Sequence, residues 1–490
     1  MEGVSMTMKF ELLAREDMQK VHEASLEVLA RTGMKIGSEK MLTILHKRGA
    51  KVDLNAQTVL FPEKLVERAL ENNRRLLEAG KKLHLLNGVT SEIIEGSSIG
   101  AKVSGGCEKY LDWESQSIQN ARASELVKYI RVGQIIPEVS FIGNPLVIHS
   151  DFDGKKIDER LRRVKTAALI AKNTNKIGSM EIWDEREIDF LVEIGSIARG
   201  GRMQFNEKPC LLTAKETISP LFLDGHSGNI LLELAKRELP CTIIPMPITG
   251  LSAPVTKLGN AVVGNAEILG VMTAVQSVYP ESPVGGGTIS GIMDMQTSVV
   301  SFSAPEAILQ DIAIAEVHKN LYGFNYLIGS GYFDAKYPNH QVIAEKTMKY
   351  LFTYLSGRYS YPVGLINSGA VFSIEQALVD IEICRYIHAH FGDFATPGDL
   401  DGLGDLIHRV GIRGQYVTED HTLQHFRKNW FPQILDRSSF ISFDENKRRD
   451  IYNNAHERIK SIIAAGNFWE IETERAREID RVVRSAEKVL

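Results

Sequence analysis

Short apolar runs alternate with amphipathic helical patterns through the middle of this 490-residue chain, and this alternation most constrains its fold. Runs of this length, bounded by turn residues, are typical of parallel strands buried on both faces. Eight of them occur, at residues 102–104, 140–142, 176–180, 210–213, 241–246, 283–286, 325–329 and 363–367. Eight strand–helix units in succession predict an α/β fold, a (β/α)8 TIM barrel over residues 101–391.

The segments between the runs have the 3.6-residue periodicity of amphipathic helices. We expect helices at residues 124–136, 160–172, 184–198, 225–236, 260–278, 305–321, 341–355 and 374–389. The segments that directly follow the runs are rich in Gly, Pro, Ser and Thr. In a barrel they would form one set of loops at the carboxyl ends of the strands, where such folds carry their chemistry.

Both ends of the chain lack this alternation. Residues 1–100 predict an N-terminal α+β extension, in which helices at 15–32, 38–48 and 62–72 precede a small antiparallel piece at 83–101. Residues 392–490 predict a C-terminal extension, in which a glycine- and aspartate-rich loop leads to helices at 418–429, 444–463 and 470–490. The extra helices are compatible with a homo-oligomer.

Composition excludes several classes of protein. The formal net charge is −5, so the chain has no strong footprint for nucleic acid or an anionic membrane. We find no signal peptide and no apolar stretch that we expect to span a bilayer. The four cysteines form no CxxC pair, and His421 and His425 lack an HExxH pattern, so we predict no metal site. These features predict a cytoplasmic protein.

The residues that follow the predicted strands are acidic and aromatic, with few cations. Carboxylates are Glu181, Glu216 and Asp334, and the nearby basic groups are Lys215, Lys336 and His149. Aromatic faces and diffuse negative charge suit a cationic ligand such as a quaternary ammonium, which has no N–H to donate. The alternative is that these side chains are ordinary rim residues that satisfy loop backbone groups.

Four segments together resemble the trimethylamine methyltransferase family of corrinoid-dependent enzymes. They are residues 250–276, 281–306, 329–347 and 420–437, and the likeness extends over most of the chain from about residue 10. The resemblance implies a (β/α)8 barrel that passes a methyl group from a methylamine to the corrinoid (cobalamin) of a cognate partner protein. Archaeal trimethylamine enzymes of the family carry pyrrolysine, whereas this chain reads through as standard residues. It therefore resembles the non-pyrrolysine branch, some members of which demethylate glycine betaine, carnitine or proline betaine.

The resemblance implies a quaternary amine as the small-molecule substrate, with glycine betaine first. Attack by Co(I) on an N-methyl carbon releases a neutral amine, so positioning suffices and no catalytic acid, base or nucleophile is assigned. The expected ammonium cage consists of Trp183, Phe302, Tyr332 and Phe333, with negative potential from Glu181 and Glu216. The cation for a substrate carboxylate is expected among His149, Lys336 and His340.

Two other functions stay open. A non-catalytic betaine-binding protein could use the same barrel. An unrelated barrel lyase or hydrolase would need a catalytic lysine, metal cluster or acid–base pair at the strand ends, and Lys215 is the strand-end lysine that could serve it.

Overall fold

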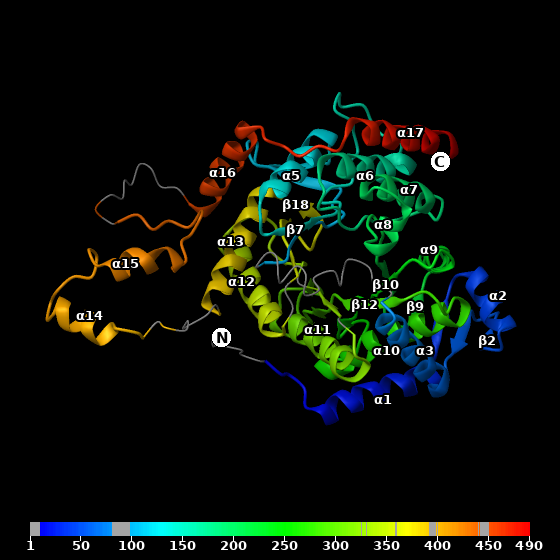
Figure 1. Ribbon diagram of the computed structural model, residues 1–490. Coiled ribbons are helices and arrows are strands. Elements are labelled where there is room, and N and C mark those ends of the chain that lie inside the picture. The colour runs from blue at the N-terminus through cyan, green and yellow to red at the C-terminus, as the bar shows by residue number, and fades with distance from the viewer. Residues whose placement is uncertain are drawn as a thin grey trace.

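The structure is a computed structural model that describes residues 10–80, 99–324, 326–329, 331–357, 360–391, 398, 400–439, 441 and 450–490. Helices are arranged around a set of short strands (Figure 1). The helices are α1 (Arg15–Arg31), α2 (Glu39–Lys47), α3 (Glu63–Glu78), α5 (Ala123–Ile135), α6 (Arg162–Asn173), α7 (Glu187–Arg199), α8 (Arg202–Glu207), α9 (Gly225–Lys236), α10 (Lys257–Val278), α11 (Pro305–Val317), α12 (His340–Leu355), α13 (Ile374–His390), α14 (Leu403–Val410), α15 (Asp420–His425), α16 (Ile451–Ala465) and α17 (Thr473–Val489). The strands are β1 (Met34–Ile36), β2 (Lys51–Asp53), β3 (Thr58–Leu60), β4 (Ala101–Val103), β5 (Lys109–Asp112), β6 (Ser117–Asn120), β7 (Val139–Ile142), β8 (Lys215–Glu216), β9 (Phe222–Leu223), β10 (Cys241–Ile244), β11 (Ile248–Thr249), β12 (Val284–Thr288), β13 (Gly291–Met293), β14 (Val300–Ser301), β15 (Leu327–Ile328), β16 (Tyr361–Pro362), β17 (Leu365–Ile366) and β18 (Val371–Phe372).

The central strands run parallel in two groups, β16–β4–β7 and β8–β10–β12–β15. Residues between the groups connect them without forming full strands. Ile142 of β7 bridges Ile177, and the amide of Leu211 donates to the carbonyl of Gly178 at 2.8 Å. The mixed α/β class is therefore confirmed, and the predicted runs from β4 to β15 lie side by side in chain order. The run predicted at 363–367 begins just after its parallel strand, β16, which pairs with β4.

A ring of strands is not closed within the described residues, because no ladder there joins β15 to β16. Both strands have only two residues, and residues 325, 330, 358 and 359 next to them lie outside the described part of the chain. The short strands leave few backbone groups with which a ladder could form. Loop contacts connect the two sides, since the amide of Asn367 donates to the carbonyl of Ala335 at 2.8 Å.

Glycine allows β12 and β15 to approach closely. All five residues of β12 are buried, and a Cβ on Gly287 would lie 2.7 Å from the Cβ of Leu327 in β15. Any larger residue at 287 would force the strands apart. This glycine run therefore serves strand packing.

The eight helices predicted between the strands are confirmed. Four of them begin at a polar residue whose side chain accepts hydrogen bonds from the first-turn amides, as N-cap residues do: Asp224 before α9, Thr256 before α10, Asn339 before α12 and Ser373 before α13. Helix α11 ends earlier than predicted, at Val317, and the chain continues as one π-helical segment, His318–Tyr322.

Helix α10 is long and apolar enough to cross a membrane by length and composition, contrary to the expectation from sequence. However, 78% of its most apolar window is buried inside the structure, where it packs against α1, α3 and α11. A helix that is apolar all round is typical of a large protein's core as well as of a membrane. Burial in the core accounts for its composition.

The N-terminal strands form a small sheet in the order β2–β3–β1–β9. The first three are antiparallel, and β9, which lies far along the chain, adds parallel to β1. The antiparallel piece predicted at 83–101 lies mostly outside the described residues. Helices α1 and α3 pack on α10, which fixes this region to the body.

The C-terminal helices follow two courses. Helix α16 packs against α13 and α5, and α17 packs against α6 and α7. Helices α14 and α15 instead extend away from the body (Figure 1). Helix α15 is shorter than the predicted 418–429 helix, because a 3₁₀ turn, Phe426–Lys428, follows it.

Candidate functional site

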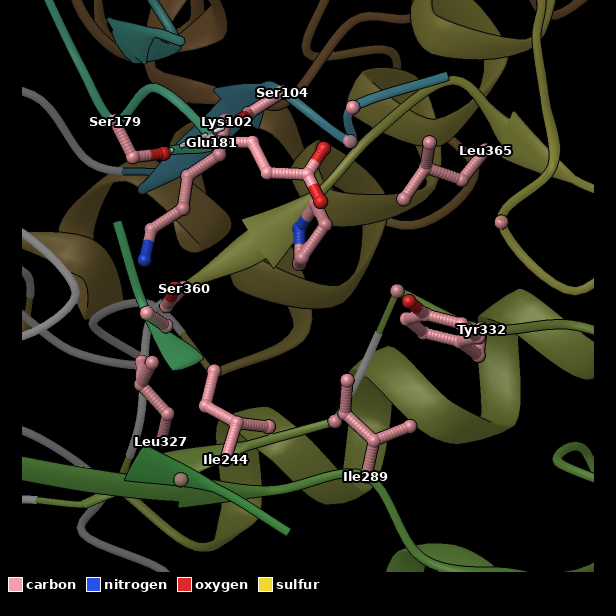
Figure 2. Close-up of a pocket in the computed structure, with 18 of the residues that line it drawn as sticks. Lys102, Ser104, Ser179, Glu181, Ile244, Ile289, Leu327, Tyr332, Ser360 and Leu365 are labelled. Atoms are coloured by element: carbon pink, nitrogen blue, oxygen red, sulfur yellow. Dashed lines mark hydrogen bonds between the residues drawn. The ribbon is translucent and has the colours of Figure 1, made fainter. Parts of the chain in front are cut away.

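A cavity of about 410 Å³ opens at the carboxyl ends of the parallel strands. This size is within the range of small-molecule sites. Its walls come from β4, β7, β10, β12, β15 and β16 and from the loops that follow them. Figure 2 shows Lys102, Glu181 and Tyr332 on different parts of its wall. The strand order thus gathers residues more than 200 positions apart in the sequence.

Two predicted carboxylates, Glu181 and Glu216, line the cavity. About half of the Glu216 side chain (49%) is exposed, and the residue is part of the cavity wall. Burial raises the pKa of Glu216, the nearby Lys215 ammonium opposes that rise, and the charge of Glu181 adds to it. Both side chains direct negative charge at the same space.

Tyr332 is the predicted aromatic residue that lines the cavity. Its ring packs against Phe302, with ring centroids 5.4 Å apart, although Phe302 itself is not in the lining. Gly369, at φ +79°, also lies close to the ring, because a Cβ added to it would lie 3.2 Å from Tyr332. Burial raises the pKa of Tyr332 to about 12, so its hydroxyl stays protonated near neutral pH.

The loop that carries Tyr332 is fixed by two side chains of α12. The ammonium of Lys349 donates to the carbonyl oxygens of Phe302 at 2.7 Å and Tyr332 at 2.8 Å. Glu345 Oε2 accepts from the amides of Asp334 at 3.1 Å and Ala335 at 3.2 Å. Asp334, expected among the cavity carboxylates, accepts from the amide of Phe302 at 2.8 Å and so serves the loop backbone.

Phe333 and Trp183 were predicted for the ammonium cage, but neither lines the cavity. The Phe333 side chain is completely buried, with the ammonium of Lys346 4.5 Å from its ring centroid. Trp183 is 49% exposed, and the Arg163 guanidinium lies 4.5 Å from its ring centroid. The structure therefore places both rings outside the cavity that Tyr332 lines.

The cations predicted for a substrate carboxylate also lie elsewhere. His149 contacts Glu108, with 3.5 Å between Nε2 and Oε2, and burial lowers its pKa. Lys336 and His340 are exposed on the loop before α12 and at its first residue. Lys215, the candidate catalytic lysine of a barrel lyase or hydrolase, donates to the carbonyl of Ile182 at 3.2 Å and is not in the cavity lining.

Lys102 is the cation that sequence reasoning missed. It lies in β4 between two buried residues, is 4% exposed, and lines the cavity with its ammonium 4.8 Å from the ring centroid of Phe141. Burial lowers its pKa to about 7. A lysine inside a strand that is otherwise apolar is the sequence signal that could have identified it.

The remaining polar groups near the cavity and in α15 were compared with the requirements of a metal site and of a ligand contact. Within the described residues, no group of three or more His, Cys, Asp or Glu side chains could hold a metal ion. His421 and His425 stack on each other in α15, with centroids 4.4 Å apart. The buried amide nitrogen of Asn144 lines the cavity and has no hydrogen-bond partner among these residues, as expected for a group that faces a ligand.

The chain is similar to known methyltransferases. The model of the trimethylamine methyltransferase (MTTB) family matches residues 3–488. The trimethylamine methyltransferase MttB of Desulfitobacterium hafniense is 25% identical over 450 residues, which cover 91% of this chain and 88% of that protein. A glycine betaine methyltransferase of Desulfitobacterium hafniense is 28% identical over 314 residues, or 63% of this chain and 64% of that protein. The structure of the Methanosarcina barkeri monomethylamine methyltransferase aligns with 96% of this chain and 93% of its own, at 11% identity and a TM-score of 0.44. Because the family model spans nearly the whole sequence, this chain belongs to the trimethylamine methyltransferase family and is a methyltransferase.

Proposed function

We propose that this enzyme takes a methyl group from a quaternary amine and passes it to the Co(I) of a corrinoid on a cognate partner protein. Glycine betaine is the substrate we propose first, and carnitine and proline betaine are the alternatives. The observation that carries the proposal is the cavity where Glu181, Glu216 and Tyr332 meet. The names of the relatives, which act on trimethylamine or glycine betaine, support a methylated amine as the substrate class.

The charge of the cavity suits a quaternary ammonium. Such a cation cannot donate an N–H hydrogen bond, so it is held by ring faces and by negative potential. The face of Tyr332 would contribute roughly 0.5–2 kcal/mol, and the two carboxylates would add negative potential from the cavity wall. Together these groups favour a permanently charged cation such as a quaternary ammonium.

Transfer from such a substrate needs positioning more than proton transfer. The N–CH₃ bond breaks as its carbon bonds to the nucleophile, and the electron pair stays on the nitrogen, which leaves as a neutral tertiary amine. The corrinoid supplies that nucleophile when its carrier protein docks. The cavity walls hold the ammonium, limit its rotation and keep water away from the reacting methyl group.

Several glycines form part of the cavity wall. Gly105, Gly106, Gly331 and Gly369 all line it. A Cβ on Gly106 would lie 2.9 Å from Glu181 Oε2, so a side chain there would crowd the carboxylate. Side chains at these positions would meet other residues of the wall, such as Leu365 at Gly105 and Tyr332 at Gly369, so the glycines keep the wall compact and add no bulk to the cavity.

Our proposal also covers barrel closure, cellular location and oligomeric state. We propose that the strands close into a (β/α)8 barrel over residues 101–391, flanked by extensions at 1–100 and 392–490. We also propose that the enzyme is cytoplasmic and assembles as a homo-oligomer. Small-angle scattering would measure the mass of the assembly.

The test is methyl transfer to cob(I)alamin, followed by the visible spectrum of methylcobalamin. The purified enzyme is mixed with glycine betaine, carnitine, proline betaine or trimethylamine in separate reactions. Methylation from one quaternary amine supports the proposal and identifies the substrate. Calorimetric binding of a betaine without methylation, when both cob(I)alamin and a corrinoid protein are supplied, would instead indicate a non-catalytic binding protein.

A further inference from the structure

One buried cation in the cavity has no counter-ion. Among the described residues, no carboxylate oxygen lies within 4.0 Å of the Lys102 ammonium, the distance that defines an ion pair. The ammonium also forms no hydrogen bond with these residues. The ring of Phe141 lies close to it, with its centroid 4.8 Å from the ammonium. Burying an unpaired charge is costly, so an amine in such a place favours an anion that enters with a ligand.

The two sides of the cavity therefore differ in charge. In the view of Figure 2 the Lys102 side chain extends toward Ser360, whereas the carboxylate of Glu181 lies toward Tyr332 and Leu365. Tyr332, whose ring is the aromatic wall for an ammonium, belongs to the acidic side. One side of the cavity is thus basic, and the other is acidic and aromatic.

We propose that Lys102 binds the carboxylate of the substrate and restricts the enzyme to quaternary amines that carry an acid group. This inference rests on the proposed function, because it places the ammonium of the same molecule between Glu181, Glu216 and Tyr332. A short zwitterion matches both sides of the cavity at once. Trimethylamine, tetramethylammonium and choline fill the acidic side but leave Lys102 unpaired.

The experiment is isothermal titration calorimetry with glycine betaine, choline and tetramethylammonium. The variants are Lys102→Met, which keeps the length of the side chain without its charge, and Lys176→Met as the matched control. Lys176 is a partly buried lysine that donates to the carbonyl of Ile136 at 2.8 Å and is not in the cavity lining.

We expect the wild type to bind glycine betaine more tightly than choline or tetramethylammonium. Lys102→Met should weaken glycine betaine binding by about 10- to 150-fold, the range for loss of a hydrogen bond to a charged group. The affinities of choline and tetramethylammonium should stay unchanged, and Lys176→Met should leave all three unchanged. A preference for glycine betaine that survives in Lys102→Met would overturn the inference.

A second readout needs no variant. If the carboxylate pairs with Lys102, glycine betaine binding at pH about 8 should take up protons, measured as a dependence of the binding heat on the buffer's ionisation enthalpy. Tetramethylammonium binding should take up none. Equal proton uptake for both ligands would overturn the role of Lys102 while the proposed function stands. Absence of binding of every quaternary amine to the wild type would overturn both.

Discussion

At the scale of single residues, the neighbours Tyr332 and Phe333 have opposite roles. Tyr332 lines the cavity, whereas Phe333 is completely buried among side chains of α12. Successive side chains of an extended segment point to opposite sides, so one aromatic pair can serve a ligand and the core. The sequence alone shows two adjacent rings and does not distinguish between them.

This difference predicts opposite effects of two alanine substitutions. Tyr332→Ala should weaken binding of the quaternary amine by about 0.5–2 kcal/mol and change stability less. Phe333→Ala should lower the free energy of unfolding by about 3–5 kcal/mol, because it leaves a cavity in the core. Calorimetric affinity and urea unfolding of both variants measure the two effects. A large loss of stability in Tyr332→Ala together with a loss of affinity alone in Phe333→Ala would contradict the placement of the rings.

Lys102 makes the stability of the enzyme depend on pH. Its pKa falls from 10.5 in the unfolded chain to about 7 in the folded one, owing to burial. Between these values the unfolded state binds more protons, so this residue's destabilising contribution is largest below pH about 7 and disappears as pH rises to 10.5. Lys102→Met should therefore raise the free energy of unfolding by roughly 1–4 kcal/mol at pH 6 and have little effect near pH 10. Denaturant titrations at both pH values measure this, and an equal gain at each would contradict it.

At the scale of elements, α12 controls the loop of the site. Lys349 and Glu345 hold the segment around Tyr332 through its backbone carbonyl and amide groups. Helix α12 does not line the cavity itself. It is thus a positioning element, and its side chains act through Tyr332.

Substitution of Lys349 should consequently affect binding through the loop. Lys349→Met would leave the carbonyls of Phe302 and Tyr332 without their donor, so we expect KM to rise by about tenfold while kcat falls less. Hydrogen exchange of the loop amides should accelerate. Lys336→Met, an exposed lysine of the same loop, is the control and should change neither. An unchanged exchange rate in Lys349→Met would contradict the positioning role.

What the sequence could predict also depends on the element. The 3.6-residue period of apolar residues was enough to predict the helices. Glu181, Glu216 and Tyr332 were predicted because each follows closely after an apolar run. Lys102 was missed because it lies inside its strand, where its orientation depends on strand register. Trp183, Lys336 and His340 follow strands too, but further along their loops, where tertiary packing decides which way a side chain points.

At the scale of the whole molecule, side chains secure the seam between β15 and β16, where the described residues form no ladder. Lys346 of α12 and Asp380 of α13 form a completely buried ion pair at 2.5 Å. Asp380 also accepts from the amide of Gly364 at 2.7 Å, just after β16. Tyr350 of α12 donates to the carbonyl of Pro362 at 2.7 Å. Two helices therefore support β16, which pairs with β4 on one side but forms no ladder with β15 among the described residues.

The buried ion pair beside this seam predicts that substitutions of Lys346 and Asp380 have strongly coupled effects on stability. Asp380→Leu alone should lower the free energy of unfolding by about 3–5 kcal/mol, because it leaves the Lys346 ammonium buried without a partner. Lys346→Met together with Asp380→Leu should recover much of that loss, since an apolar pair of similar size carries no unpaired charge. Urea unfolding of the single and double variants measures the coupling. Strictly additive losses would show that the pair does not act as a unit, and the seam would then depend on the packing of α12 and α13 alone.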